Sequence, residues 1–411
     1  MGGPPYDYSS LTTSEPLMRY YLMLATLTVS VLLVGCSPFA PQGGLKVKEV
    51  AEEKYTLDIF DNTPTFSQAL AINATGQIIG IREVAREEGT ILSQEPFFID
   101  GKQSTRVPLL DEYTNIELNA LSDNGLVVGY ASRPLGNPEG STTGFVWDSK
   151  TGVMTRLMPA GNDVACHAQS ISAAGDRITG YTAGSKPTRM LPCVWDWNQT
   201  EKKWQIETLE TIEDYNPYIM SSGVVVSPDG QRIAACITVA NLPNDMYDSS
   251  LCHWQQADGV WKRQLVCDDQ MYLCSMNNAG QIAGVITRDA VRLPCMVDVS
   301  GQVNLIDLLP GDVSGEARGI NSAGIIVGFS DDPAGPEGGP LAFVWKDGTT
   351  SELDLPVGTT ASAAFGINEQ GQIAGLLDVP DADNAEEEDA EVQTLAFRWT
   401  PKGSEKGSEK K

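Results

Sequence analysis

The sequence predicts an all-β fold, a seven-bladed β-propeller of four-stranded antiparallel blades that is closed by an N-terminal strand. Three observations support this prediction. A short phrase, in which Asn or Ser is followed after two residues by Gly and then by an apolar strand, returns seven times along the 411 residues. Each copy is followed by further strand-like phrases, and helical periodicity is almost missing. A repeat of about fifty residues is typical of four-stranded propeller blades; an open array of β-sandwiches or two smaller β domains is the alternative.

Each copy of the phrase predicts a β-hairpin. Its leading Asn or Ser can bond to its own backbone and open a type I turn. The Gly three residues later accepts the left-handed conformation that lets the second strand leave the turn. The segment AINATGQIIG at 71–80 shows the pattern. The turn glycines are 44 to 55 residues apart: Gly76, Gly125, Gly175, Gly230, Gly280, Gly324 and Gly371.

Two later phrases complete each repeat. Alternating large residues before a charged or turn residue, as in FVWD at 145–148, predict a third strand with one buried face. The phrases VNLIDLLP at 303–310 and SELDLP at 351–356 predict a fourth strand. After Trp399 no such phrase follows, but an unassigned strand of that type, YTLDIF at 55–60, precedes the first hairpin. We therefore expect this strand to complete the seventh blade and close the ring.

The first residues predict an export signal. Arg19 precedes an apolar run at 20–35, which is short for a membrane span and suits a signal-peptide core. The following Leu33-Val34-Gly35-Cys36 resembles the lipobox of bacterial lipoproteins, which implies acylation of Cys36 and a firm membrane anchor. A plain cleaved signal or an uncleaved anchor remains the alternative. The predicted organisation is a signal peptide at 1–35 with translation starting at Met18, a tether at 36–50, the propeller at 51–401 and a disordered tail at 402–411.

Composition excludes several classes of function. A formal charge of −26 argues against nucleic acid, whose affinity depends on Lys and Arg, and against a polybasic membrane patch. The only two histidines, His167 and His253, carry no nucleophile signature, and zinc-binding Cys-x-x-Cys or His-x-x-x-His motifs are missing. We therefore expect structural histidines and no cofactor.

Seven cysteines fall in the repeats. Cys193, Cys252 and Cys295 share one strand position with phenylalanines of other blades, so we expect them to be buried packing residues. Disulfides between Cys236 and Cys252, or between Cys267 and Cys274, stay open because each pair lies on neighbouring segments and the protein is expected to be exported.

Long, variable loops predict the ligand surface. The loops at 130–143, 236–250, 329–341 and 376–394 emerge on the face opposite the short hairpin turns, and such loops usually carry binding. An acidic run at 378–392 holds eight carboxylates and no base, which suggests calcium, but it lacks the spacing of a calcium loop and is more typical of solvated chain. The candidate ligand-binding residues are Asp331, Asp332, Glu337, Asp378, Asp381, Asp383 and Glu386.

The whole repeat resembles the HAF-type extracellular repeat family. The best matches are GINSAGIIVG with LAFVW at 341–345, and GINEQGQIAG with LAFRW at 395–399. The likeness covers about residues 55–400, although the fourth copy, VVVSPDGQRIAA, is more similar to TolB-type and WD40-like repeats. The resemblance implies an exported propeller-like domain with no catalytic residues to carry over. It also implies core roles for the matching tryptophans, which are Trp147, Trp195, Trp254, Trp345 and Trp399.

These observations favour a lipid-anchored, extracytoplasmic monomer of the bacterial envelope. We expect it to be non-catalytic and to bind or scaffold a protein or, as second choice, a cell-surface polysaccharide. A propeller hydrolase or lyase with its site at the central channel is one alternative, which a cluster of basic or metal-binding groups on the axis would favour. A passive structural component of the envelope is the other.

Overall fold

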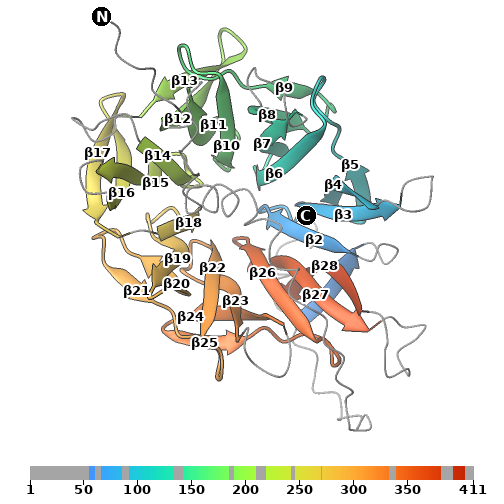
Figure 1. The fold of residues 1–411 in the computed structure, drawn as a ribbon. Coiled ribbons are helices and arrows are strands. Elements are labelled where there is room, and N and C mark those ends of the chain that lie inside the picture. Colours follow the sequence, from blue (N-terminus) through green and yellow to red (C-terminus); the bar gives the residue numbers. More distant parts are fainter. Residues whose placement is uncertain are drawn as a thin grey trace, which may run out of the picture. The chain divides into compact units, whose positions relative to one another are not determined.

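The seven repeats fold into seven four-stranded antiparallel sheets arranged as the blades of a β-propeller (Figure 1). The computed structural model describes residues 55–60, 66–85, 92–133, 142–184, 189–209, 219–241, 246–269, 271–332, 339–380 and 392–402. All of them belong to one unit, Glu49–Ala385 with Glu391–Lys411. The predicted signal peptide, tether and Cys36 lie outside the described residues. None of the described segments forms a helix with the length and hydropathy of a membrane span.

The strands of each blade follow one another from the axis outward. The innermost strands of blades 1 to 7 are β2 (Ser67–Ile72), β6 (Asn115–Leu121), β10 (Ala165–Ile171), β14 (Ile219–Val226), β18 (Met271–Met276), β22 (Ser314–Ile320) and β26 (Ala361–Ile367). The second strands are β3 (Ile78–Ala85), β7 (Leu126–Ser132), β11 (Arg177–Ala183), β15 (Arg232–Asn241), β19 (Ile282–Arg288), β23 (Ile326–Asp331) and β27 (Ile373–Pro380).

The outer half of each blade completes the sheet. The third strands are β4 (Leu92–Asp100), β8 (Thr142–Asp148), β12 (Met190–Asn198), β16 (Met246–Ala257), β20 (Val291–Val297), β24 (Leu341–Lys346) and β28 (Val392–Pro401). The outermost strands are β5 (Gln103–Arg106), β9 (Met154–Arg156), β13 (Lys203–Thr208), β17 (Val260–Cys267), β21 (Val303–Leu305) and β25 (Thr349–Glu352), with β1 (Tyr55–Phe60) in blade 7.

The N-terminal strand closes the ring as predicted. β1 pairs antiparallel with β28 over six residues, from Tyr55 opposite Pro401 to Phe60 opposite Ala396. An ion pair of 2.6 Å between Arg398 Nη2 and Asp58 Oδ2 lies across this seam. Because the first and last strands of the fold share one sheet, the seventh blade has no exposed third-strand edge.

The hairpin turns are also confirmed. All seven turn glycines have positive φ, between 71° and 87°. In the first turn, the carbonyl of Asn73 accepts the N–H of Gly76 and its side-chain Oδ1 accepts the N–H of Gln77. An L side chain rarely adopts this conformation, which explains why glycine returns at this position.

The hydrophobic core lies between neighbouring blades. One cluster joins Ile79 and Phe98 of blade 1 to Ile116 and Trp147 of blade 2, and the others follow the same scheme. Trp147, Trp195 and Trp254 are buried, as the repeat pattern predicts. Trp345 and Trp399 are only partly buried. Each blade therefore depends on its neighbour for a closed core, as expected for a repeat fold.

Two details of the sheets differ from the sequence prediction. The predicted loop at 236–250 is wrong, because β15 and β16 stay paired as far as Asn241 opposite Met246. The fourth strands end early: in blade 6 the ladder stops at Glu352, and Leu353 leaves it to bury its side chain while its N–H donates to the carbonyl of Ala342. The apolar end of the fourth phrase is thus core packing and not strand pairing.

The cysteines are thiols. All seven in the described residues are free, and Cys193, Cys252 and Cys295 are fully buried as predicted. A bridge between Cys236 and Cys252 is excluded by register. Cys236 lies opposite Leu251 and Cys252 lies opposite Ala235, so the two thiols project from opposite faces of the blade 4 sheet.

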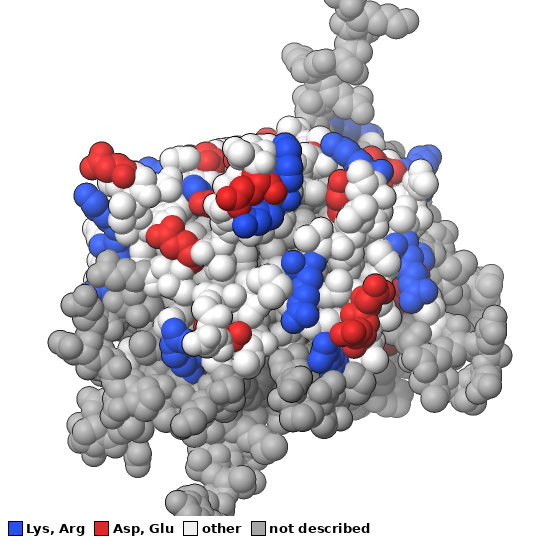
Figure 2. Space-filling view, turned by 90° about the horizontal axis from the view of Figure 1, so that it is seen from above, with Lys and Arg blue, Asp and Glu red and all other residues white. Residues whose placement is uncertain are grey.

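The surface in Figure 2 carries both signs of charge, with Lys and Arg side chains lying close to Asp and Glu side chains. Several of these are ion pairs across a blade, such as Arg82 with Glu95 and Arg177 with Asp196. By contrast, seven acidic residues and no basic residue occupy 381–391 in the sequence. A good part of the net negative charge therefore belongs to one segment and not to the blades.

Candidate functional site

A cavity of about 230 Å³ lies on the propeller axis, at the end where the hairpin turns emerge. Residues from the innermost strands or turns of all seven blades line it. Six wall side chains come from the same position of their repeats, three residues before the turn Asn or Ser: Leu70, Asn119, Gln169, Cys274, Arg318 and Phe365.

A β-bulge delivers each of these six side chains. In every one of the six blades the ladder between the first and second strands skips this residue, as between Ala317 and Gly319 around Arg318. A bulged residue is unpaired and its side chain is re-aimed. In these six blades, the residue that forms the cavity wall is therefore the one that makes no pair in the ladder.

The bulge explains the last Gly of the repeated phrase. Gly328 lies beside the bulge of blade 6, where a Cβ would overlap the carbonyl oxygen of Glu316 and come within 2.9 Å of Phe343 Cζ. In blade 4 the phrase has Ala234 instead, and there the register shift is wider, between Ser222 and Val225, with Gly223 at φ 58°. The departure of the fourth copy from the repeat thus accompanies a different bulge.

Asparagines of the turns tie the blades together around the mouth. Besides ordering its own turn, Asn73 donates from Nδ2 to the carbonyl of Ser122 in the next blade at 2.9 Å. Asn277, Asn321 and Asn368 repeat this bond, and Asn368 reaches Asn73 across the closure. The turn serines instead use their single hydroxyl donor within their own turns. Asparagine therefore has a role beyond the turn that the sequence predicts for it.

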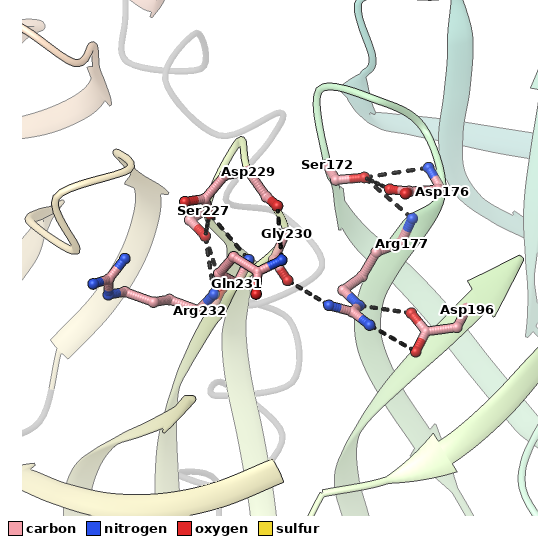
Figure 3. A network of polar contacts seen from close by, with 9 residues as sticks. All are labelled: Ser172, Asp176, Arg177, Asp196, Ser227, Asp229, Gly230, Gln231 and Arg232. Atoms are coloured by element: carbon pink, nitrogen blue, oxygen red, sulfur yellow. Dashed lines mark hydrogen bonds and ion pairs between the residues drawn. The ribbon is translucent and has the colours of Figure 1, made fainter. Parts of the chain in front are cut away.

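In blades 3 and 4, where the turn residue is serine, arginines make the bond to the next blade (Figure 3). Arg177 donates from Nε and Nη2 to the two carboxylate oxygens of Asp196. Its Nη1 donates to the carbonyl of Gly230 in blade 4 at 2.5 Å. Arg232 bonds in the same way to the carbonyl of Asn278 in blade 5 at 2.9 Å. Asn124 Nδ2 donates to the carbonyl of Ala174 between blades 2 and 3, so bonds of this kind join all seven neighbouring pairs of blades.

Two carboxylates lie at the mouth of the cavity. Asp123 accepts the N–H of Ala74 at 2.9 Å, and Glu369 accepts the hydroxyl of Ser322 at 2.8 Å together with its N–H. Both residues belong to hairpin turns and both line the cavity. The mouth is therefore acidic and fixed in place by backbone donors of neighbouring blades.

Charged groups also meet deeper in the wall. Arg318 Nη1 lies 3.0 Å from Glu316 Oε2, and Arg292 pairs with the other oxygen of the same carboxylate. The guanidinium of Arg318 stacks over the ring of Phe365, 5.4 Å from its centroid. Burial raises the pKa of the nearby Cys274 thiol to about 11, so this thiol stays protonated at neutral pH.

Both histidines are held neutral. His167 lies between the rings of Tyr130 and Tyr181, with centroid distances of 3.8 and 4.7 Å. Its Nδ1 bonds to the hydroxyl of Tyr181 at 2.7 Å and its Nε2 to the hydroxyl of Thr142 at 2.8 Å. Burial lowers the pKa of His167 to about 3, and burial followed by the charge of Arg232 lowers that of His253 to about 4. Within the described part of the chain, neither imidazole is hydrogen-bonded to a serine or cysteine.

Three of the seven predicted ligand residues lie in the described part of the chain. Asp331 ends β23 of blade 6, next to Asp332, whereas Asp378 lies on β27 of blade 7 and accepts the hydroxyl of Thr394 at 2.7 Å. Burial raises the pKa of Asp331 and of Asp378. The other four, Glu337, Asp381, Asp383 and Glu386, lie outside the described residues. Among the residues described, no group of three His, Cys, Asp or Glu could hold a metal ion.

No family model and no curated protein matches this sequence. Solved structures do match its fold. The β-propeller domain of the Trilobed protease from Pyrococcus furiosus is 11% identical with a TM-score of 0.53, covering 85% of this chain and 96% of that one. A prolyl endopeptidase (11% identity, TM-score 0.51, 83% of this chain and 51% of that one) and a Mycobacterium tuberculosis puromycin-hydrolyzing peptidase (11%, 0.50, 80% and 50%) are also similar. This chain spans about half the length of the latter two.

The comparison confirms the propeller fold and corrects the expected function. The prediction of a non-catalytic propeller that binds or scaffolds a protein or glycan is wrong by this measure, because the similar structures are peptidases or a propeller domain of a protease. The alternative, a propeller hydrolase with its site at the central channel, agrees better with them. The Pyrococcus domain has an open velcro topology, whereas β1 closes the ring in this chain.

Proposed function

We propose that this protein has a hydrolase-type function in which the central channel binds a peptide-like substrate. The observation that carries the proposal is the cavity on the axis, whose wall is made of side chains released by the bulges. Amide, guanidinium and hydroxyl groups alternate there with apolar side chains such as Leu70 and Phe365. A few convergent polar groups in an otherwise apolar pocket are what a binding site requires.

The size of the cavity limits the substrate. Pockets for drug-sized ligands measure about 300 to 1,000 Å³, and 230 Å³ is below that range. The cavity therefore suits one or two residues at the end of a chain and not a folded protein. We do not assign bond cleavage to either histidine, because the hydroxyls of Tyr181 and Thr142 occupy both nitrogens of His167, and His253 is on the third strand, away from the cavity wall.

Blocking the cavity tests the proposal. Leu70 is one of the bulged residues that line the cavity, and Leu70→Trp places an indole in it. We expect the purified full chain to hydrolyse members of a synthetic pool of short peptides, and Leu70→Trp to slow this at least about tenfold because a misplaced substrate loses its alignment. Mass spectrometry of the pool over time measures the products.

The matched control is Leu70→Met, which nearly conserves the side-chain volume, leaves the cavity open and should retain the rate. The melting temperatures of both variants show that the propeller is intact. A wild-type chain that releases no products, or products whose rate Leu70→Trp leaves unchanged, would contradict the proposal.

We also propose, from the sequence, that the chain belongs to the HAF-type repeat family and is held outside the cytoplasm by lipid on Cys36. The support is the lipobox-like Leu33-Val34-Gly35-Cys36 after the apolar run. We expect the mature protein to begin at an acylated Cys36 and to partition into detergent. Cys36→Ala should abolish acylation, whereas Ser37→Ala should retain it. Mass spectrometry of the mature N-terminus decides, and an unmodified Cys36 there would refute the anchor.

A further inference from the structure

The charges along the cavity wall are arranged in two levels. Asp123 and Glu369 make the mouth acidic, and Arg318 places a guanidinium in the wall at the bulge of blade 6. Arginine stays protonated at every physiological pH. A ligand that enters from the mouth therefore passes carboxylates before it meets a cation.

The cation is not fully neutralised by its neighbours. Two guanidinium groups, those of Arg318 and Arg292, share the single carboxylate of Glu316. Burial raises the pKa of Cys274 to about 11 and also raises the pKa of Tyr272, so neither adds a negative charge. The cluster carries one positive charge in excess. Because Arg292 lines no part of the cavity, Arg318 is the member that can offer this charge to a ligand.

The guanidinium is held in a fixed plane. Its stacking on Phe365 and its bond to Glu316 at 3.0 Å restrain it from two sides, and its side chain is only 17% exposed. Guanidinium has five N–H donors in a rigid fork that matches a carboxylate. A pre-oriented, poorly solvated fork loses little entropy when it binds an anion.

A second donor lines the same wall. Gln169 Oε1 accepts the N–H of Val224 at 2.9 Å, which fixes the orientation of the amide and leaves its NH2 group as the end that can donate to a ligand. Leu70 and Phe365 supply apolar surface between the polar groups. The wall thus offers two kinds of donor beside an apolar surface, which suits a carboxylate attached to an organic chain.

The acidic mouth disfavours the entry of small multivalent anions. Phosphate or sulfate would have to pass Asp123 and Glu369 with no positive charge of its own. A peptide end carries one negative charge at its tip, and its backbone N–H groups and any basic side chain face the carboxylates of the mouth favourably. The narrow volume of 230 Å³ admits such an end but not a folded chain.

From this geometry we propose that the central cavity recognises the C-terminal carboxylate of a peptide, with Arg318 as the group that binds it. This inference rests on the proposed function and names the substrate class more closely: peptides with a free C-terminus, inserted carboxylate first. Arg318 acts in binding and takes no part in proton transfer.

Binding of labelled peptides tests the proposal independently of turnover. The probes are three pools of N-terminally fluorescein-labelled pentapeptides: one with free C-termini and no acidic residues, the same pool amidated, and an amidated pool with one internal Glu. Fluorescence anisotropy with the full chain measures the affinities. We expect the first pool to bind at least about tenfold more tightly than either amidated pool, as for the loss of one charge-assisted hydrogen-bond pair.

Variants assign the effect to Arg318. Arg318→Met should reduce the ratio between the free and amidated pools to about one, and Arg318→Lys should keep part of it. Arg292→Met should also lower the ratio, because Glu316 then neutralises Arg318 alone. Arg288→Met is the matched control, because it removes a guanidinium from an ion pair with Asp269 that lines no part of the cavity, and it should keep the preference. Should Arg318→Met fail to fold, the preference of the wild-type chain among the three pools still decides.

The outcomes separate this inference from the proposed function. Equal binding of free and amidated pools would overturn the inference and leave peptide binding in the channel standing. Equal binding of the free pool and the Glu-containing pool would overturn recognition of the chain end. A chain that binds no pool contradicts both proposals, and a preference that Arg318→Met leaves unchanged overturns the assignment to Arg318.

Discussion

Deletion of residues 50–62 is expected to lower the free energy of unfolding by about 5 kcal/mol or more. The deletion removes β1, so the six-residue ladder with β28 is lost at about 1 kcal/mol for each hydrogen bond. Leu57 and Phe60 no longer pack on the neighbouring clusters, and the ion pair of Asp58 with Arg398 disappears. The third strand of blade 7 becomes an open edge that can pair with other chains. Urea unfolding and light scattering measure both effects.

The control is deletion of residues 403–411, which leaves the paired residues of β1 and β28 intact and should leave stability unchanged. A synthetic peptide of residues 50–62 added to the truncated protein should restore part of the lost stability by binding the folded state. A truncated chain that unfolds at the same urea concentration as the parent would show that pairing of β1 with β28 contributes nothing to stability.

The hairpin turns and the closing strand β1 were predictable from the sequence because their signals are local or repeated. Asn73 and Gly76 lie in one turn, and their chemistry is decided within four residues. The position of YTLDIF before the first hairpin could be interpreted as a missing fourth strand because the other six repeats showed what was missing. Because the repeats are alike, counting the strands in each was enough to predict the long-range contact between Tyr55 and Pro401.

The cavity was not predictable in the same way. Whether Arg318 pairs in the ladder or is skipped depends on the register between β22 and β23, and a one-residue shift reverses which side chains face the core. The sequence does hold a signal, the polar or charged residue three positions before the turn in Asn119, Gln169 and Arg318. Without the register, this position is indistinguishable from an ordinary strand residue. The long loops were the more conspicuous feature of the sequence. They led to a predicted site on the face opposite the hairpin turns, whereas the cavity lies at the end where those turns emerge.

Gly328→Ala is expected to lower the free energy of unfolding by about 3 kcal/mol or more, at the upper end of the usual cost of overpacking because the site cannot relax. The new Cβ would overlap the carbonyl of Glu316 and lie 2.9 Å from Phe343 Cζ. Phe343 is fully buried and cannot move aside. The carbonyl can retreat only if the bulge that holds Arg318 changes shape. Thermal and urea unfolding measure the loss.

Two substitutions make the comparison specific to the bulge. Gly184→Ala adds the same methyl group at a site where the nearest neighbouring atom, Asp163 Oδ1, is 3.6 Å away, and it should change stability little. Ala234→Gly, at the blade 4 position that already tolerates a Cβ, should cost about 1 to 2 kcal/mol, from backbone entropy and from the loss of one buried methyl group. If Gly328→Ala costs no more than Gly184→Ala, the close approach of the bulge is not what keeps glycine at the end of the repeated phrase. If it costs the expected amount while the chain still folds, the displaced bulge should also weaken the preference for free over amidated peptides, because the strain acts on the backbone that positions Arg318 beside Glu316.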